Sequence, residues 1–290
     1  MRIALRNEFG SFEMGGGSHP SARLIEITGL GVPGKENTTI VFEGQPGQTL
    51  TESRDMERTI TMSFDFYGDE RTVQKLYRII YRPVTIYFYL NNGERRKIVG
   101  HCTQSTDITK IIYHKWQSVV LQFICYDPYF HNVTNTVLKI AKPVNKLPNV
   151  NENGEWYVQL PAVATEIDKT VIANNTGQTI LYPIIKIYSN KSEDDNPEAY
   201  GIVISNKTTG GVITIEYNLS VNEALRVDIP QRKIISNING DITNYMSDDT
   251  VLSSFFLDIG ENIITVDNPN PNDKMYAEIE FTNNYMAVVI

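Results

Sequence analysis

The stretch RTITMSFDFYGDERTVQKLYRIIYRPVTIYFYL, residues 58–90, decides the fold. Residues 59–67 alternate between apolar and polar side chains, which is the period of a strand buried on one face. Asp69 is a suitable N-cap for a helix, and Pro83 ends that helix because proline disfavours helical backbone at the residue before it. Residues 84–90 are rich in β-branched and aromatic side chains, so the stretch predicts strand, helix and strand.

The helix predicted at about residues 70–82 carries one apolar stripe. Its members follow the helical spacing i, i+3, i+4 and i+7: Val73, Leu76, Tyr77 and Ile80. A helix with a single apolar face between two strands is expected to lie on a sheet. The pattern indicates no second helix of comparable strength, and the rest of the chain is predicted to be β.

The remaining pattern also favours β-structure. Residues 116–126 alternate as a long strand, whereas residues 34–54 are predicted to be a long excursion outside the core. Many short strand candidates separated by Asn- and Gly-rich turns follow between residues 170 and 281, which is typical of a β-sandwich. The predicted fold class is therefore mainly β, with two β-sandwich domains of which the first carries one α-helix.

Charge divides the chain near residue 131. Residues 1–130 hold 15 Lys and Arg against 14 Asp and Glu, whereas residues 131–290 hold 11 against 20. A shift of this size supports a domain boundary. We expect a first domain at 1–130, a connecting segment at 131–160 and a second domain at 161–290. The acidic second half would repel nucleic-acid phosphates.

Composition limits the class of protein. With 41% hydrophobic and 21% charged residues, the 290-residue chain is expected to fold and to be long enough for two domains. No apolar run reaches the roughly 18 residues that a membrane span needs. The N-terminus has no signal-peptide pattern and there are only two cysteines, so we expect cytoplasmic synthesis, no disulfide framework and no membrane insertion.

Two motifs that suggest cofactors do not hold up. Residues 29–35 have the letters of a phosphate loop, but Glu36 replaces the magnesium-binding hydroxyl and a strand candidate follows in place of a helix. His101 and Cys102 could suggest zinc with Cys125 or His131, but neighbours on a strand point to opposite faces. We therefore expect no cofactor and no metal.

Catalytic patterns are absent as well. The acid pairs Asp194-Asp195 and Asp248-Asp249 lie in turn-like sequence, and no Ser-His-Asp motif occurs. We interpret the chain as a protein that is not an enzyme. Two binding sites stay as hypotheses: glycan contact at Trp156 and Tyr157, and a basic turn facing a ring or pore at Arg95, Arg96 and Lys97.

The sequence resembles the distal tail proteins of phages that infect Gram-positive bacteria. In the first half the resemblance rests on residues 58–90 and on FICYDPYF at 123–130, because the first domain of that family commonly ends in a similar Asp-Pro-aromatic sequence. In the second half it rests on LRVDI at 225–229 and on FFLDIGENII at 255–264. The excursion at 34–54 is placed where family members carry an extended arm.

The resemblance implies a fold and a role. It implies a tail-tube-like first domain whose six copies form a ring, and a galectin-like second domain. The hexamer would join the tail tube protein to a tail-tip or tail-associated lysin protein, at the tip of a virion tail assembled in the bacterial cytoplasm, and DNA would pass through its pore. The nearly neutral first half suits close packing of copies.

Two other functions are alternatives to this structural hub. The first is a carbohydrate-binding module that contacts host cell-wall glycans through exposed aromatic side chains. The second is a glycan-cleaving enzyme, which requires two carboxylates across a groove. A ring seen by electron microscopy would favour the structural hub. Binding to cell walls would favour the carbohydrate-binding module, and turnover of peptidoglycan would favour the enzyme.

Overall fold

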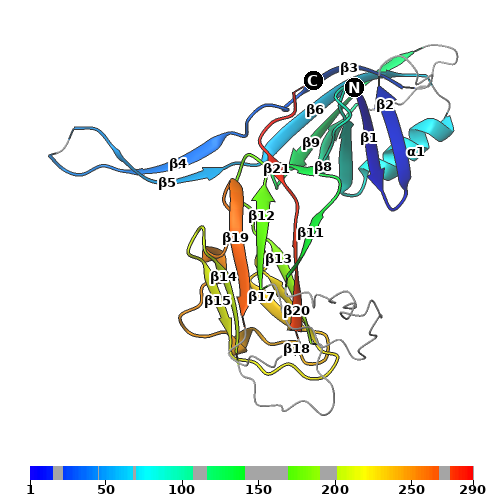
Figure 1. The fold of residues 1–290 in the computed structure, drawn as a ribbon. Coiled ribbons are helices and arrows are strands. Elements are labelled where there is room, and N and C mark those ends of the chain that lie inside the picture. The colour runs from blue at the N-terminus through cyan, green and yellow to red at the C-terminus, as the bar shows by residue number, and fades with distance from the viewer. Residues whose placement is uncertain are drawn as a thin grey trace, which may run out of the picture. The chain divides into compact units, whose positions relative to one another are not determined.

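A computed structural model gives the fold (Figure 1). It describes residues 1–15, 22–44, 46–67, 70–106, 116–140, 169–189, 201–267 and 275–289. The chain divides into two compact units, Met1–Val133 with Asn284–Ile290, and Thr134–Asn283. The described part is mainly β with a single α-helix, which confirms the predicted fold class. Among the described residues, no helix has the length and apolar character needed to span a membrane.

The first unit is built on a sheet with the strand order β2-β1-β7-β8-β9-β6-β3. Short strands β10 and β21 pair with each other, and β10 also pairs with β8. The edge strands β2 and β3 lie close together without being hydrogen-bonded neighbours, so the sheet curls around its core. The strands are β1 (Arg2–Asn7), β2 (Gly10–Gly15), β3 (Ala22–Thr28), β6 (Arg58–Phe66), β7 (Val84–Tyr89), β8 (Arg95–Ser105), β9 (Gln117–Cys125), β10 (Phe130–Asn132) and β21 (Asn284–Tyr285).

The stretch 58–90 has the predicted structure. Strand β6 runs antiparallel to β9 and alternates strictly between buried and accessible side chains. Helix α1 (Glu70–Ile80) packs against β1 and β2, and it ends two residues before the predicted position. Its buried residues are Val73, Leu76, Ile79 and Ile80. The predicted N-cap, Asp69, lies outside the described residues.

The excursion at 34–54 forms an antiparallel hairpin of β4 (Lys35–Ile40) and β5 (Thr49–Asp55), which we call the arm. These two strands pair with each other and with no other described strand (Figure 1). Every described residue of both strands is exposed except Asp55, which is half-buried. The arm therefore lies outside the core, as predicted.

Gly29, at the root of the arm, has a backbone conformation that a residue with a side chain cannot adopt without strain. Its φ is +85°, and a Cβ atom built on it lies 2.0 Å from the carbonyl oxygen of Thr59. We expect Gly29→Ala to lower the free energy of unfolding by at least about 2 kcal/mol, because positive φ and backbone overlap both add strain. Chemical denaturation measures this loss. The control is Gly31→Ala, where a Cβ meets nothing within 4 Å; an equal effect of both variants would contradict the prediction.

The second unit is a sandwich of two sheets. Their strand orders are β11-β20-β13-β16-β17-β18 and β12-β19-β14-β15. The inner faces bury a common apolar core that contains Ile187, Ile204, Phe255 and Ile279. The elements are β11 (Thr136–Ile140), β12 (Thr170–Asn175), β13 (Ile184–Ser189), β14 (Ile202–Asn206), β15 (Val212–Ile215), β16 (Ala224–Asp228), β17 (Lys233–Ser236), β18 (Gly240–Asp241), the 3-10 turns Thr243–Tyr245 and Leu252–Ser254, β19 (Gly260–Asp267) and β20 (Met275–Phe281).

The structure differs from the predicted segments in two places. Residues 136–140, predicted to connect the domains, form strand β11, which pairs with β20; residues 141–160 lie outside the described part. The predicted second domain extends to residue 290, whereas Asn284–Ile290 belong to the first unit. The reason is non-local, because the backbone N–H of Val288 donates to the carbonyl oxygen of Leu30 at 3.0 Å and its side chain is buried.

Candidate assembly surfaces

The arm exposes large apolar side chains around its tip. Ile40 is 46% exposed, Val41 64%, Phe42 51% and Leu50 57%. Exposed apolar residues that are scattered singly are ordinary, but several on one exposed hairpin form a candidate surface for contact with another protein. Because the two strands also leave backbone groups unpaired along their outer edges, the arm offers both apolar contact and hydrogen bonding to a partner.

The root of the arm is held by a buried arginine. Arg58 is only 4% exposed. Its Nε donates to the carbonyl oxygen of Pro128 at 2.7 Å, and its Nη2 donates to that of Met286 at 2.6 Å. Its Nη1 donates to the carbonyl oxygens of Gly29 at 2.7 Å and Gly31 at 2.5 Å. One guanidinium thus binds three separate segments of the first unit.

Neighbouring groups complete this site. The guanidinium of Arg58 lies over the ring of Phe130, 4.5 Å from its centroid. Burial lowers the pKa of Arg58, and burial raises the pKa of the Cys125 thiol to about 12. The hydroxyl of Tyr129 donates to the carboxylate of Asp55 at the end of β5, which ties the second strand of the arm to the same region.

Sequence reasoning did not identify Arg58, although a signal was present. In the alternation of residues 58–66, Arg58 occupies the same side as the buried Ile60 and Met62. A charged residue in the buried phase of a strand requires partners, since an unpaired buried charge is costly. The pattern therefore predicts a bonded arginine, but the partners are distant carbonyl groups that no local motif reveals.

The predicted basic turn is divided by the structure. Arg95 and Lys97 share a face of β8 with each other, whereas Arg96 is buried on the opposite side. Arg96 donates to Asn132 at 2.8 Å and to Glu94 at 2.7 Å, and lies over the ring of Tyr285. That these three residues face a ring or pore stays a prediction.

Arg95 has other basic neighbours that the sequence did not bring together. Strand β7 lies between β1 and β8, so that Arg2, Tyr89 and Arg95 are cross-strand neighbours. The guanidinium groups of Arg2 and Arg95 lie 4.2 and 5.6 Å from the centroid of the Tyr89 ring. Arg6 on the same strand as Arg2 also bonds the hydroxyl of Tyr89, at 3.1 Å. Cation–π contacts of this kind order the arginines on the surface.

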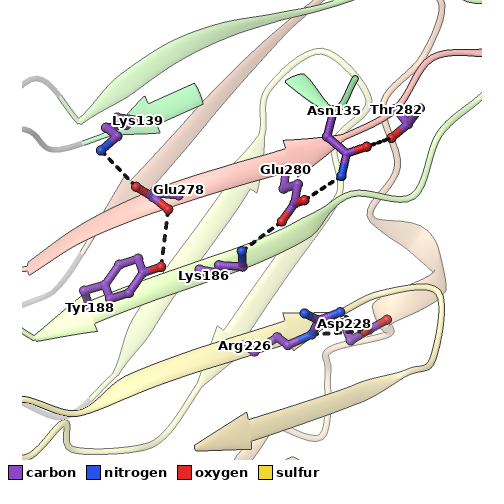
Figure 2. Close-up of polar contacts among 9 residues, drawn as sticks. All are labelled: Asn135, Lys139, Lys186, Tyr188, Arg226, Asp228, Glu278, Glu280 and Thr282. Carbon is purple, nitrogen blue, oxygen red and sulfur yellow. Dashed lines mark hydrogen bonds and ion pairs between the residues drawn. The ribbon is translucent and has the colours of Figure 1, made fainter. Parts of the chain in front are cut away.

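The larger sheet of the second unit carries a ladder of ion pairs on its outer face, shown in Figure 2. Lys139 pairs with Glu278 at 3.0 Å, Lys186 with Glu280 at 2.9 Å, and Arg226 with Asp228 at 2.8 Å. Three hydrogen bonds extend the ladder: the Tyr188 hydroxyl donates to Glu278, the Asn135 amide to Glu280, and the Thr282 hydroxyl to Asn135. The three carboxylates of Figure 2, those of Asp228, Glu278 and Glu280, therefore all have partners.

These pairs have a clear electrostatic effect. The bonds from Lys186 and Asn135 lower the pKa of Glu280, and the bond to Glu280 raises the pKa of Lys186. Lys139 and Lys186 are accessible, and ion pairs at a protein surface stabilise it by only about 0–1 kcal/mol each, whereas Asp228 is buried beside Arg226. These pairs make the outer face of the larger sheet charged and not apolar.

The remaining candidate residues form no binding or metal site within the part of the chain that the structure describes. Trp156, Tyr157 and the pair Asp194-Asp195 lie outside the described residues. Asp248 and Asp249 lie exposed in a turn. Within the described part of the chain, no group of three or more His, Cys, Asp or Glu side chains is arranged to hold a metal ion.

Comparison with known proteins identifies the class of fold. Residues 176–285 match the family model of the siphovirus-type tail component, C-terminal domain. The chain resembles the crystal structure of the Dit protein of phage SPP1, a paradigm of the hub adsorption apparatus in phages infecting Gram-positive bacteria. The TM-score is 0.62 and the identity 15%, over 91% of this chain and 93% of that chain.

A second structure shows the same type of fold. It is a chain of the phage P2 baseplate in its activated conformation with calcium, with a TM-score of 0.50 and 11% identity over 99% of each chain. No curated protein gives a significant sequence match. The resemblance to phage distal tail proteins is thus confirmed, in fold over most of the chain and by the family model over residues 176–285.

Proposed function

We propose that this protein is a structural distal tail protein, the hub of a phage or phage-tail-like particle, and not an enzyme. The match of residues 176–285 to the siphovirus tail component carries the proposal. The similarity of fold to the SPP1 hub over 91% of the chain supports it. In this role the protein acts through shape and association, which requires no catalytic groups.

In the finer form of the proposal, six copies form a ring at the tail tip. The ring joins the tail tube protein to a tip or tail-associated lysin protein, and DNA passes through its pore. The exposed apolar residues of the arm support association between copies, since burying each large apolar side chain contributes about 1.5–3 kcal/mol. A head-to-tail contact that repeats around an axis closes into a ring.

Negative-stain electron microscopy of the purified full chain tests this proposal. We expect annular particles with six-fold symmetry. Mass photometry of the same sample should give a species of six times the 32.9 kDa chain mass. A monomer that persists across protein concentrations, with and without the tail tube protein, would contradict the ring. A ring with another number of copies would contradict the hexamer but not the hub.

The carbohydrate-binding alternative stays a prediction. Its expected aromatic contacts lie outside the described residues, and the outer face in Figure 2 has its carboxylates already paired. No contact among the described residues favours a glycan ligand over solvent.

A further inference from the structure

Arg58 differs from an ordinary buried ion pair in the kind of partner it has. Its four hydrogen bonds all go to backbone carbonyl oxygens, and among the described residues no carboxylate forms an ion pair with it. A guanidinium has five N–H groups, so four of them are satisfied by these contacts. The segments that supply the carbonyls therefore replace the water that the charge loses on burial.

The first of these segments is the root of the arm. The carbonyls of Gly29 and Gly31 flank Leu30, whose side chain is buried, and β4 begins at Lys35, four residues after Gly31. Where the arm returns, the N–H of Met56 donates to the carbonyl oxygen of Gly34 at 2.8 Å. The direction in which the arm leaves the sheet is thus set next to the guanidinium.

The second and third segments connect the first unit to the rest of the chain. Pro128 precedes β10, from which the chain continues into the second unit. Met286 lies in residues 284–289, the C-terminal strap, which returns from that unit and pairs with β10 through Asn284 and Tyr285. The strap also contacts the arm root directly, because the N–H of Val288 donates to the carbonyl oxygen of Leu30.

We infer that Arg58 is a positioning residue, which fixes the direction of the arm and makes it depend on the seating of the C-terminal strap. If the strap leaves, the guanidinium loses the carbonyl of Met286 and Leu30 loses the bond from Val288. The buried guanidinium is then bound only by the carbonyls of Pro128, Gly29 and Gly31 and is incompletely solvated. The arm root and the strap consequently stabilise each other, although neither is near the other in sequence.

The biological use of this coupling rests on the proposed function, in which the arm contacts another copy. The coupling itself is a property of a single chain. It can be measured whether or not a ring forms, and failure of the ring would leave the measurement valid.

Electron paramagnetic resonance can measure the coupling as the spread of arm positions. Spin labels are placed at Ser53→Cys on the arm and Val120→Cys on β9, both exposed, in a Cys102→Ser background. Buried Cys125 stays unlabelled. The labelled full chain is mixed with excess unlabelled protein, so that distances within one chain dominate. The width of the distance distribution reports how firmly the arm is held.

We expect Arg58→Lys to widen this distribution about two-fold, because lysine keeps the charge but offers a compact ammonium in place of a planar fork. We expect Val288→Gly to widen it as well, since it loosens the strap without touching Arg58. The double variant should be no wider than Arg58→Lys. Because Val288→Gly is the milder change, the test stands even if Arg58→Lys fails to fold.

Arg96→Lys is the matched control. Arg96 is also buried, but its contact with the strap is to the Tyr285 ring and not to the Met286 carbonyl or the Val288 N–H, the two groups through which the strap binds the arm root and Arg58. It should lower the melting temperature without widening the distribution. Unchanged widths in Arg58→Lys and Val288→Gly would overturn the positioning role. Strictly additive broadening in the double variant, or equal broadening by Arg96→Lys, would overturn the coupling.

Discussion

Replacing Phe42 and Leu50 with aspartate is expected to weaken self-association in the proposed ring strongly and to leave the folded chain intact. Both side chains are more than half exposed, so their replacement should change the free energy of unfolding by no more than about 0.5 kcal/mol. In the proposed ring they become buried against a neighbouring copy, where two apolar contacts are lost and two charges lose water. We expect association to weaken at least about 100-fold, measured by sedimentation velocity over a range of concentrations.

Ile259→Asp is the control for this experiment. Ile259 is 58% exposed, but it lies in a turn of the second unit away from the arm in sequence. It should leave both the melting temperature and the association constant unchanged. If the arm variant associates as strongly as the parent chain, the arm is not the contact between copies.

Removing one core phenylalanine from each unit will show whether the units unfold separately. Phe64 is fully buried in the first unit, with its ring 5.6 Å from that of Phe12, and Phe255 is fully buried in the second. We expect Phe64→Ala and Phe255→Ala each to cost about 3–5 kcal/mol, through lost burial and the cavity left behind. In calorimetry each should lower a different transition, by roughly 10 °C.

This pair of variants tests our proposal of two domains that fold on their own cores. The units are separate clusters of buried residues, and each variant is the control for the other. A single transition that both variants lower equally would mean that the chain unfolds as one cooperative body. Circular dichroism at low temperature should confirm that both variants are folded before heating.

The sequence predicted the strand, helix and strand of residues 58–90 because the signals for these elements are local. Alternation in 59–67, the apolar stripe of the helix and Pro83 each act within a few residues, and the strand, helix and strand form where expected. The end of the helix was wrong by two residues, since helix ends fray and depend on nearby contacts. The sandwich of the second unit was predicted for the same local reason, from short strands between turns.

The same local signals misassigned segments whose structure depends on distant partners. TVLKI at 136–140 lies near polar and proline-rich sequence, yet it forms an edge strand because β20 supplies its hydrogen bonds. The strap forms only two strand residues, too few to give a period, and its place depends on Leu30 and Arg58. Neither pairing can be read from the residues on either side.

The sequence by itself determined that this chain is mainly β, that one amphipathic helix covers a sheet, and that residues 34–54 leave the core of the first half. Periodicity and turn chemistry specify such features, because neighbouring residues are enough to form them. Only the tertiary structure decided that Arg58 joins the arm root to the C-terminal strap and that Arg96 turns away from Arg95 and Lys97. A buried charge is stabilised by whatever donors and acceptors the fold brings to it, and these lie up to 228 positions away in the chain.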